Sequence, residues 1–215
     1  MSIAHEYVKA HFEQFQEQLF DLLRIPSIST SAERAGEVKR AADWLEADLK
    51  RIGMHTVEVI RTAGHPIVYA EWMGAGVDAK TILIYGHYDV QPVNPIEEWG
   101  TPPFEPTISG EYLIGRGASD MKGQVMASLA AVESVLAAGH LPVTLKFLLE
   151  GEEEIGSPSL DGFIETHADL LACDIVLNPD SGMVTKDAPT IVYGLRGLLY
   201  LEMRLDGPKA DLHSG

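Results

Sequence analysis

The stretch TILIYGHYD, residues 81–89, begins with the apolar run Thr81–Tyr85, which is followed by Gly86, His87, Tyr88 and Asp89. A short run without a polar face is typical of a strand that is covered on both sides of a largely parallel sheet. Residues 143–149 and 174–177 predict central strands of the same kind. Together the three runs predict an α/β fold with a mostly parallel central sheet.

Helical patterns surround these runs and predict helices on both faces of the sheet. Apolar residues at spacings of three and four, with glycine and proline as stop signals, predict four helices. These cover residues 3–23, 32–52, 123–138 and 160–168. Strands are predicted at 56–60, 67–72, 190–193 and 199–205, and a hairpin turn is predicted at Ser109-Gly110. The five prolines and Trp99 of residues 91–106 predict a loop.

The composition indicates a folded, strongly acidic protein. The 215 residues are 46% hydrophobic and 22% charged, and 16 basic against 32 acidic residues give a net charge of −16. That charge repels phosphate backbones and anionic lipid surfaces, so nucleic acid and membranes are not expected as partners.

Cys173 is the sole cysteine, so an internal disulfide and a cysteine-rich zinc site are excluded. The first twenty residues read as an amphipathic helix and not as a signal peptide, and no apolar run is long enough to span a membrane. A cytoplasmic location is therefore expected.

Acidic residues and a histidine follow the predicted central strands. His87 and Asp89 follow the first run, Glu150–Glu154 follow the second, and Asp180 follows the third. Asp120, in the segment GRGASDMKG, leads into a predicted helix. Ligands bind beyond the carboxyl ends of strands in open α/β sheets, so these residues are expected to gather at one edge.

Carboxylates gathered in this way repel one another, and two like charges about 4 Å apart cost on the order of 4 kcal/mol at an effective dielectric near 20. Too few lysines and arginines lie nearby to balance them. A histidine and carboxylates without thiolates suit zinc or manganese, often as a pair of ions that share a carboxylate.

Each signal also has an ordinary structural interpretation. His87 could be a core histidine, Glu152–Glu154 a solvated acidic turn, Asp120 a helix cap and Asp180 part of a turn. The glycine-rich segment at 115–123 lacks the spacing of a dinucleotide or P-loop motif. Taken together at one sheet edge, the residues favour a metal-dependent hydrolase.

With these motifs assembled, the chain resembles the dinuclear zinc exopeptidases, a family that includes carnosinase-type dipeptidases, glutamate carboxypeptidases, aminoacylases and succinyl-diaminopimelate desuccinylase. The resemblance runs in order through GHYDVQPV, LIGRGASDMKG, LLEGEEEIGS, NPDSG, YGLRG and DLHSG. The motif sequences HYDVQP, LEGEEEIGS and DLHSG are most similar to those of the carnosinase and cytosolic dipeptidase branch.

The resemblance implies two divalent metal ions, Zn²⁺ in the first place, with Mn²⁺ or Co²⁺ as alternatives. By position, His87 and Asp180 would bind one ion, Asp120 would bridge both, and Glu154 would hold the second. The peptide bond between Asp120 and Met121 is expected to be cis.

The resemblance also implies catalytic roles. Asp89 would orient His87, and Glu153 would be the general base that passes a proton from water to the leaving amine. Because three acids are consecutive, the pair could instead be Glu152 and Glu153, although Gly156-Ser157 supports the later pair. His213 would donate to the oxyanion from the other subunit of a homodimer.

Members of the family run to about twice this length. Residues 1–197 would be the N-terminal portion of the catalytic domain, and 198–215 would begin a smaller α+β lid and dimerisation domain with its first strand. A further metal-binding histidine would follow the lid, so the chain is expected to lack it.

The predicted function is metal-dependent hydrolysis of the amide bond in dipeptides or short peptides. Deacylation of N-acyl amino acids uses the same kind of site and is the alternative within enzymes. A catalytically incomplete metal-binding fragment is the alternative outside them.

Overall fold

The structure is a computed structural model that describes residues 2–76, 78–139, 141–185 and 187–207. The α-helices are α1 (Ile3–Ala10), α2 (Phe12–Leu23), α3 (Ala35–Arg51), α4 (Lys122–Ala137), α5 (Leu160–Thr166) and α6 (Ala168–Leu171). The strands are β1 (Thr56–Ile60), β2 (Ile67–Trp72), β3 (Thr81–His87), β4 (Thr107–Ser109), β5 (Tyr112–Ile114), β6 (Thr144–Glu150) and β7 (Ile175–Leu177). Short 3-10 helices occur at η1 (Ala32–Arg34), η2 (Ile96–Glu98) and η3 (Glu153–Ile155). The chain divides into one unit that ends at Ser181 and a second that begins at Gly182.

The central sheet of the first unit has five strands in the order β1-β2-β6-β3-β7. β3 pairs in parallel with both β6 and β7, while β2 is antiparallel to β1 and to β6. The sheet is therefore mixed, because β2 alone of the five runs against the others. Of the three strands predicted as central, β3 and β6 are central, whereas β7 is the last strand in the order and its three residues are exposed. All three share one direction, and their carboxyl ends meet at one edge of the sheet.

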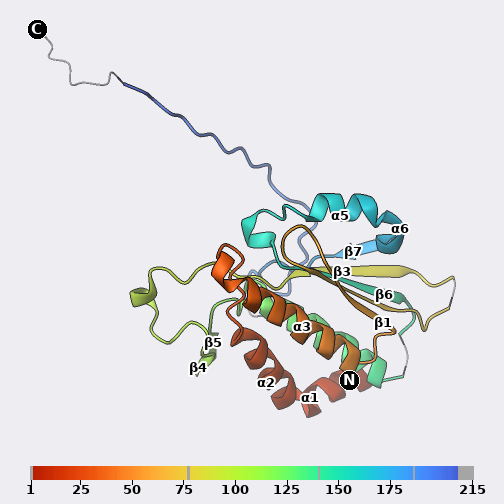
Figure 1. Cartoon of the computed structure of the whole chain (residues 1–215). Helices are drawn as coiled ribbons and strands as arrows, with labels where there is room; N and C mark the ends of the chain where they lie inside the picture. Colours follow the sequence, from red (N-terminus) through yellow and green to blue (C-terminus); the bar gives the residue numbers. More distant parts are fainter. Residues whose placement is uncertain (1, 77, 140, 186, 208–215) are drawn as a thin grey trace, which may run out of the picture. The chain divides into compact units, whose positions relative to one another are not determined.

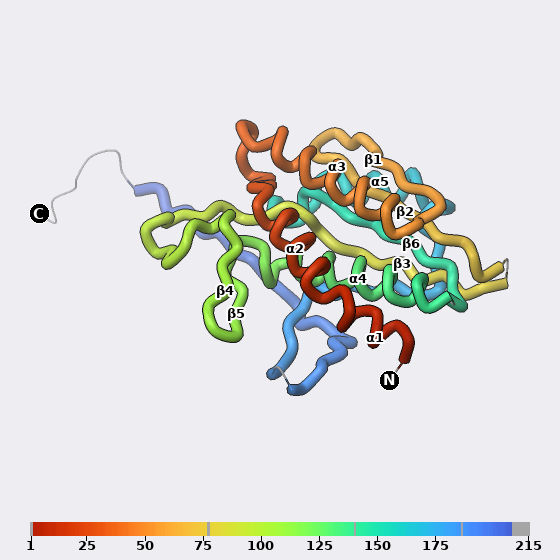
Figure 2. Tube along the Cα trace, turned by 90° about the horizontal axis from the view of Figure 1, so that it is seen from below, coloured from red at the N-terminus to blue at the C-terminus, as the bar shows by residue number. Residues whose placement is uncertain are grey.

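Helices cover both faces of this sheet, as predicted (Figure 1). One face carries α3 and α4, and α1 and α2 pack on α4 (Figure 2). The other face carries α5 and α6, whose Phe163 and Leu171 are buried with Ile67, Leu83 and Leu148 of the sheet. Because strands alternate their side chains, β6 sends Phe147 and Leu149 to the first face and Leu148 to the second.

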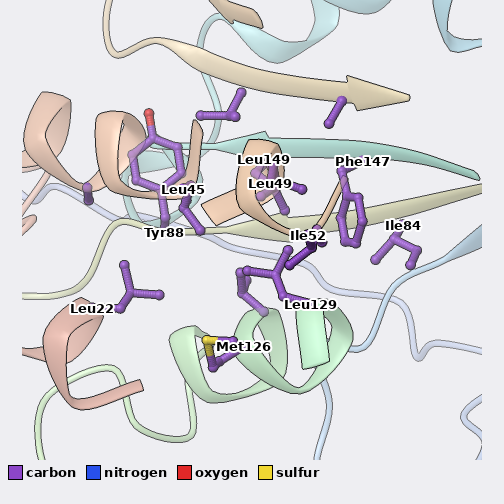
Figure 3. Close-up of a cluster of buried hydrophobic side chains, with 14 of the residues drawn as sticks. Leu22, Leu45, Leu49, Ile52, Ile84, Tyr88, Met126, Leu129, Phe147 and Leu149 are labelled. Atoms are coloured by element: carbon purple, nitrogen blue, oxygen red, sulfur yellow. The ribbon is translucent and has the colours of Figure 1, made fainter. Parts of the chain in front are cut away.

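The larger core lies between the sheet and the pair α3 and α4 (Figure 3). Leu45 and Leu49 of α3 and Leu129 of α4 are fully buried against Phe147 of β6. The spacing of four between Leu45 and Leu49 places both on the buried stripe of the helix. Burial of a large apolar side chain contributes about 1.5–3 kcal/mol, so this layer holds the sheet edge in place beneath the site.

Two predicted helices are each divided by a histidine. Residues 3–23 form α1 and α2, because His11 leaves the helical conformation and its ring nitrogen lies 2.9 Å from the carbonyl oxygen of Tyr7. Residues 160–171 form α5 and α6 around His167, whose Nδ1 lies 3.0 Å from the carbonyl oxygen of Phe163. In both places the backbone N–H of the histidine still donates to the same carbonyl, at 3.0 and 2.9 Å. The break lies in the backbone of the histidine, whose φ of −112° at His11 and −120° at His167 leaves the helical region.

The strands predicted at residues 190–193 and 199–205 are wrong for the structure as described. Residues 189–207 form no helix and no strand, and Tyr193, Leu199 and Leu201 are at least four-fifths exposed. Apolar alternation makes a strand only where a neighbouring strand satisfies its backbone groups, and none does so in this part of the unit.

Candidate metal centre

The predicted gathering of residues at the sheet edge is present. His87 is the last residue of β3, and the parallel register places it directly beside Glu150 at the end of β6. The chain that leaves β7 carries Asp180, and η3, which follows β6, carries Glu153 and Glu154. The segments that follow three neighbouring parallel strands, β6, β3 and β7, therefore lie together at one edge of the sheet.

Three of the predicted metal ligands form a compact group. His87, Asp120 and Glu154 each offer one ligand atom, and these atoms lie within 4.8 Å of one another. Nε2 of His87 is 3.0 Å from Oδ1 of Asp120. Asp120 comes from the segment before α4, where its peptide bond with Met121 is cis, as the resemblance implied. His87 is fully buried, whereas Asp120 faces solvent, so the group is open on one side.

Two further carboxylates reach the same imidazole nitrogen. Oδ2 of Asp180 is 3.8 Å and Oε2 of Glu153 is 3.9 Å from Nε2 of His87. The structure therefore brings together the four predicted ligands and the predicted general base, although distances alone assign none of their roles.

Asp89 is fully buried and contacts both His87 and the turn that carries Glu153 and Glu154. Nδ1 of His87 lies 3.1 Å from the carbonyl oxygen of Asp89 and 3.4 Å from its carboxylate. The same carboxylate accepts the backbone N–H groups of Glu153 and Glu154 at 3.3 and 3.1 Å. One side chain thus fixes the orientation of the imidazole ring and the position of the acidic turn.

The three consecutive acids of the turn are not equivalent. Glu152 is 3% exposed, and its carboxylate accepts the backbone N–H groups of His65 and Ser159 at 2.8 and 3.1 Å. Glu153 and Glu154 instead direct their carboxylates towards His87. The geometry therefore favours the pair Glu153 and Glu154 over the alternative pair Glu152 and Glu153.

The electrostatics of the group call for a cation. Burial raises the pKa values of Glu153, Glu154 and Asp180, and neighbouring carboxylates raise them further. Burial by itself would lower the pKa of His87, but the bond to Asp89 and the charges of Glu153 and Asp180 outweigh it and raise that pKa to about 9. In the absence of a metal ion, the protonated imidazole of His87 therefore supplies the positive charge among these carboxylates. Nitrogen and carboxylate ligands of this kind fit a divalent cation such as zinc or manganese.

Comparison with known proteins agrees with this geometry. Residues 83–208, more than half of the chain, match peptidase family M20/M25/M40. The chain belongs to this family. The family resemblance predicted from the motifs is therefore confirmed, and membership of this metallopeptidase family implies divalent metal.

Individual relatives of this M20 member include dipeptidases. It is 32% identical to the Cys-Gly metallodipeptidase dug1 of Schizosaccharomyces pombe, over 98% of this chain and 47% of that protein. Among solved structures, the M20 family metallo-carboxypeptidase Sso-CP2 from Sulfolobus solfataricus is 42% identical with a TM-score of 0.73, over 79% of this chain and 38% of that one. Human carnosine dipeptidase 1 is 30% identical with a TM-score of 0.76, over 83% and 40%. The chain spans at most about half the length of the curated relatives it matches.

The supporting roles of three groups at this M20 site were not predicted from the sequence. Gln91 donates from Nε2 to Oε2 of Glu154 at 2.8 Å and to its carbonyl oxygen at 3.1 Å. Glu150 accepts from the hydroxyl groups of Tyr85 and Ser157 at 2.6 and 2.9 Å, while Glu152 anchors the turn. The motifs GHYDVQPV and LLEGEEEIGS contain Gln91, Glu150, Glu152 and Ser157 but not Tyr85, and contacts between the motifs, such as that of Gln91 with Glu154, could not be read from them.

Lys122 is a fourth such residue, and it supports the segment that carries Asp120. Its ammonium group is completely buried and donates to the carbonyl oxygens of Leu22 and Ile25 at 3.1 and 2.7 Å. These carbonyls lie at the carboxyl end of α2, where a cation is favoured. Lys122 therefore joins the end of α2 to the start of α4.

His213, the predicted oxyanion donor, lies outside the described residues, as do residues 208–215 as a whole. Within the described ranges, no helix combines the length and the apolar character that crossing a membrane would require.

Proposed function

We propose that the chain carries the catalytic site of a metal-dependent peptidase that hydrolyses the amide bond of dipeptides. The observation that carries this proposal is the group His87, Asp120 and Glu154, with Asp180 and Glu153 at the same imidazole. The dipeptidase relatives support the substrate class. The proposed ions are two, with zinc first and manganese or cobalt as alternatives.

In this proposal His87 and Asp180 would hold one ion, Asp120 would bind both, and Glu154, to which Gln91 donates, would hold the second. When bound, such ions polarise a peptide carbonyl and lower the pKa of water towards neutrality. Asp89 keeps the His87 ring in a fixed orientation, which preserves the ligand set.

Glu153 is the proposed general base. Burial and neighbouring carboxylates raise its pKa, which brings its proton affinity closer to that needed near neutral pH. Its carboxylate removes a proton from the attacking water and then delivers a proton to the amine nitrogen as the C–N bond breaks. Its backbone N–H bonds to Asp89, so the base is held at a defined place beside the ligands.

Further parts of the proposal rest on the family resemblance. His213 would donate a hydrogen bond to the developing oxyanion, and the protein would act as a cytoplasmic homodimer through a lid that begins near Leu198. Residues 1–197 would then be catalytic domain, and 198–215 would belong to the lid.

The test is an assay of the protein at its natural length against Cys-Gly, β-Ala-His and N-acetyl amino acids. We expect dipeptide hydrolysis that a chelator abolishes and zinc or manganese restores. Glu153→Gln should lower kcat by about 10²–10⁴ with unchanged metal content, whereas Glu165→Gln, an exposed acid on α5, should have no effect.

Three results would contradict parts of this proposal. Unchanged turnover in Glu153→Gln would remove Glu153 as the base. Faster hydrolysis of N-acetyl amino acids would make the enzyme a deacylase. Fewer than two bound metal ions per chain, with no turnover, would indicate a metal-binding protein with an incomplete site.

A further inference from the structure

The acidic turn is held from two sides by buried carboxylates. On one side Asp89 accepts the backbone N–H groups of Glu153 and Glu154. On the other side the carboxylate of Glu152 is bound to a different part of the chain. We propose that Glu152 is a positioning residue that sets the place of Glu153 and Glu154. This inference rests on the proposed function for the roles of those two residues, and on the structure for their positions.

The side chain of Glu152 joins the acidic turn to two other segments, one 87 residues away and one seven residues away. Oε1 accepts the N–H of His65, in the loop between β1 and β2, at 2.8 Å. Oε2 accepts the N–H of Ser159, immediately before α5, at 3.1 Å. A buried carboxylate that accepts two backbone N–H groups makes charge-assisted hydrogen bonds, which are about twice as strong as neutral ones. The turn is thereby attached to two neighbouring segments.

The backbone of Glu152 belongs to the same arrangement. Its carbonyl oxygen accepts the N–H groups of Ile155 and Ser157 at 3.1 and 2.8 Å, which closes the turn. Glu153 and Glu154 lie inside this closed segment. Any displacement of Glu152 therefore moves the residues that follow it directly.

Gly64 shows that the loop is shaped around the Glu152 carboxylate. A Cβ atom at position 64 would lie 1.7 Å from Oε1 of Glu152, far inside van der Waals contact. No positive φ accompanies this glycine, so the close approach is what requires it there. The loop thus accommodates the carboxylate only because residue 64 has no side chain.

The loop is itself firmly supported. Thr62 donates from its hydroxyl to the carbonyl oxygen of His65 at 2.6 Å and accepts the N–H of Gly64 at 3.0 Å. The hydroxyl of Tyr88, a fully buried residue one position after His87, donates to the carbonyl oxygen of Pro66. The anchor of Glu152 is therefore connected to the strand end that carries the imidazole. A fixed anchor of this kind can define the distance between His87 and the turn.

The test uses two variants that disturb the same contact from opposite sides. Glu152→Gln replaces one carboxylate oxygen by an NH2 group, which cannot accept a hydrogen bond from the backbone N–H that faces it. Gly64→Ala adds a Cβ that pushes the Glu152 carboxylate away from the loop. Glu165→Gln and Gly36→Ala are matched controls, because Glu165 is exposed and nothing lies within 4 Å of a Cβ at Gly36.

The first readout needs neither metal nor substrate. Hydrogen exchange of the Glu153 and Glu154 backbone amides is measured in the metal-free chain, with the amide of Leu129 on α4 as a distant reference. We expect exchange at least tenfold faster at both amides in Glu152→Gln and Gly64→Ala, and no change in the controls. Unchanged protection at these amides would overturn the inference, whether or not the protein proves to be a peptidase.

The second readout concerns metal and turnover. Loss of a group that orients ligands typically costs 10–100-fold, so zinc affinity and kcat should each fall by that factor with little change in KM. In a Glu152→Ala background, Gly64→Ala should have no further effect, because the contact is gone. A fall in melting temperature alone, with normal zinc affinity and kcat, would show a purely structural role and overturn the inference. An absence of peptidase activity in every variant would contradict the proposed function, while amide exchange would still decide the role of Glu152.

Discussion

His87 is expected to carry a proton in the metal-free protein and to lose it when a divalent cation binds. The charges of Asp89, Glu153 and Asp180 raise its pKa to about 9 from an ordinary 6.5, although burial opposes the shift. That difference corresponds to about 3 kcal/mol in favour of the imidazolium. A metal ion needs the lone pair that holds this proton, so binding must displace it.

The pKa sets the size of the effect. At pH 7.5 a group with a pKa of about 9 is about 97% protonated, so His87 should release close to one proton per bound ion. A histidine with its ordinary value would release about 0.1 proton at that pH. Because the protonated form is favoured below pH 9, apparent metal affinity should rise about tenfold per pH unit from pH 7 to 8.5 and level off above pH 9.

Calorimetry in two buffers with different ionisation enthalpies counts the released protons. Mn²⁺ is the appropriate ion, since its bound water is a weaker acid than zinc-bound water and the protons then come from the protein. An NMR titration of the His87 ring in the metal-free chain gives the pKa independently.

Asp89→Asn tests the cause of the shift. It keeps the shape of the side chain but removes the charge 3.4 Å from Nδ1 of His87, so the pKa of His87 and the number of released protons should both fall. Asp161→Asn, at an exposed position on α5, should release as many protons as the wild type. Release near 0.1 proton in the wild type, or equal release in the wild type and Asp89→Asn, would refute this account of the site.

Three substitutions test the scaffold, each by chemical denaturation of the metal-free chain. Leu129→Ala removes a fully buried side chain from the core beneath β6 and should cost about 2–5 kcal/mol; a loss below 1 kcal/mol would contradict the described packing. Lys122→Met leaves the carbonyls of Leu22 and Ile25 without their buried donor and should cost about 1–3 kcal/mol, whereas equal stability would show that water replaces the ammonium. Gly151→Ala would place a Cβ 2.7 Å from the Tyr88 ring and should cost about 1–3 kcal/mol; a neutral result would mean that Tyr88 moves freely.

The main elements of the fold could be predicted because their patterns are local. The strands at 56–60 and 67–72 match β1 and β2, and the apolar runs match β3, β6 and β7 within two residues at each end. Hydrophobic periodicity reports which face of an element is buried, and this depends on neighbours a few residues away. The breaks at His11 and His167 were missed because they depend on the backbone conformation of a single residue, which hydrophobic periodicity does not report.

The segment at 189–207 shows where prediction from a local pattern fails. Leu199, Leu201, Met203 and Leu205 alternate with polar residues, yet they are at least 80% exposed and form no strand. Alternation describes two faces of a strand, but a strand also needs a partner for its N–H and C=O groups. A pattern within one segment carries no information about that partner.

The sequence alone determined which types of residue form the site and the order of the motifs that contain them. Their convergence followed from one rule, that parallel strands end at a common edge, and the distances around His87 agree with it. Which acid of Glu152, Glu153 and Glu154 faces the imidazole was decided by long-range contacts. The N–H groups of His65 and Ser159 hold Glu152 away from His87, and Asp89 turns the next two residues towards it. Three identical neighbouring side chains differ only in what surrounds them, and those surroundings exist only once the chain has folded.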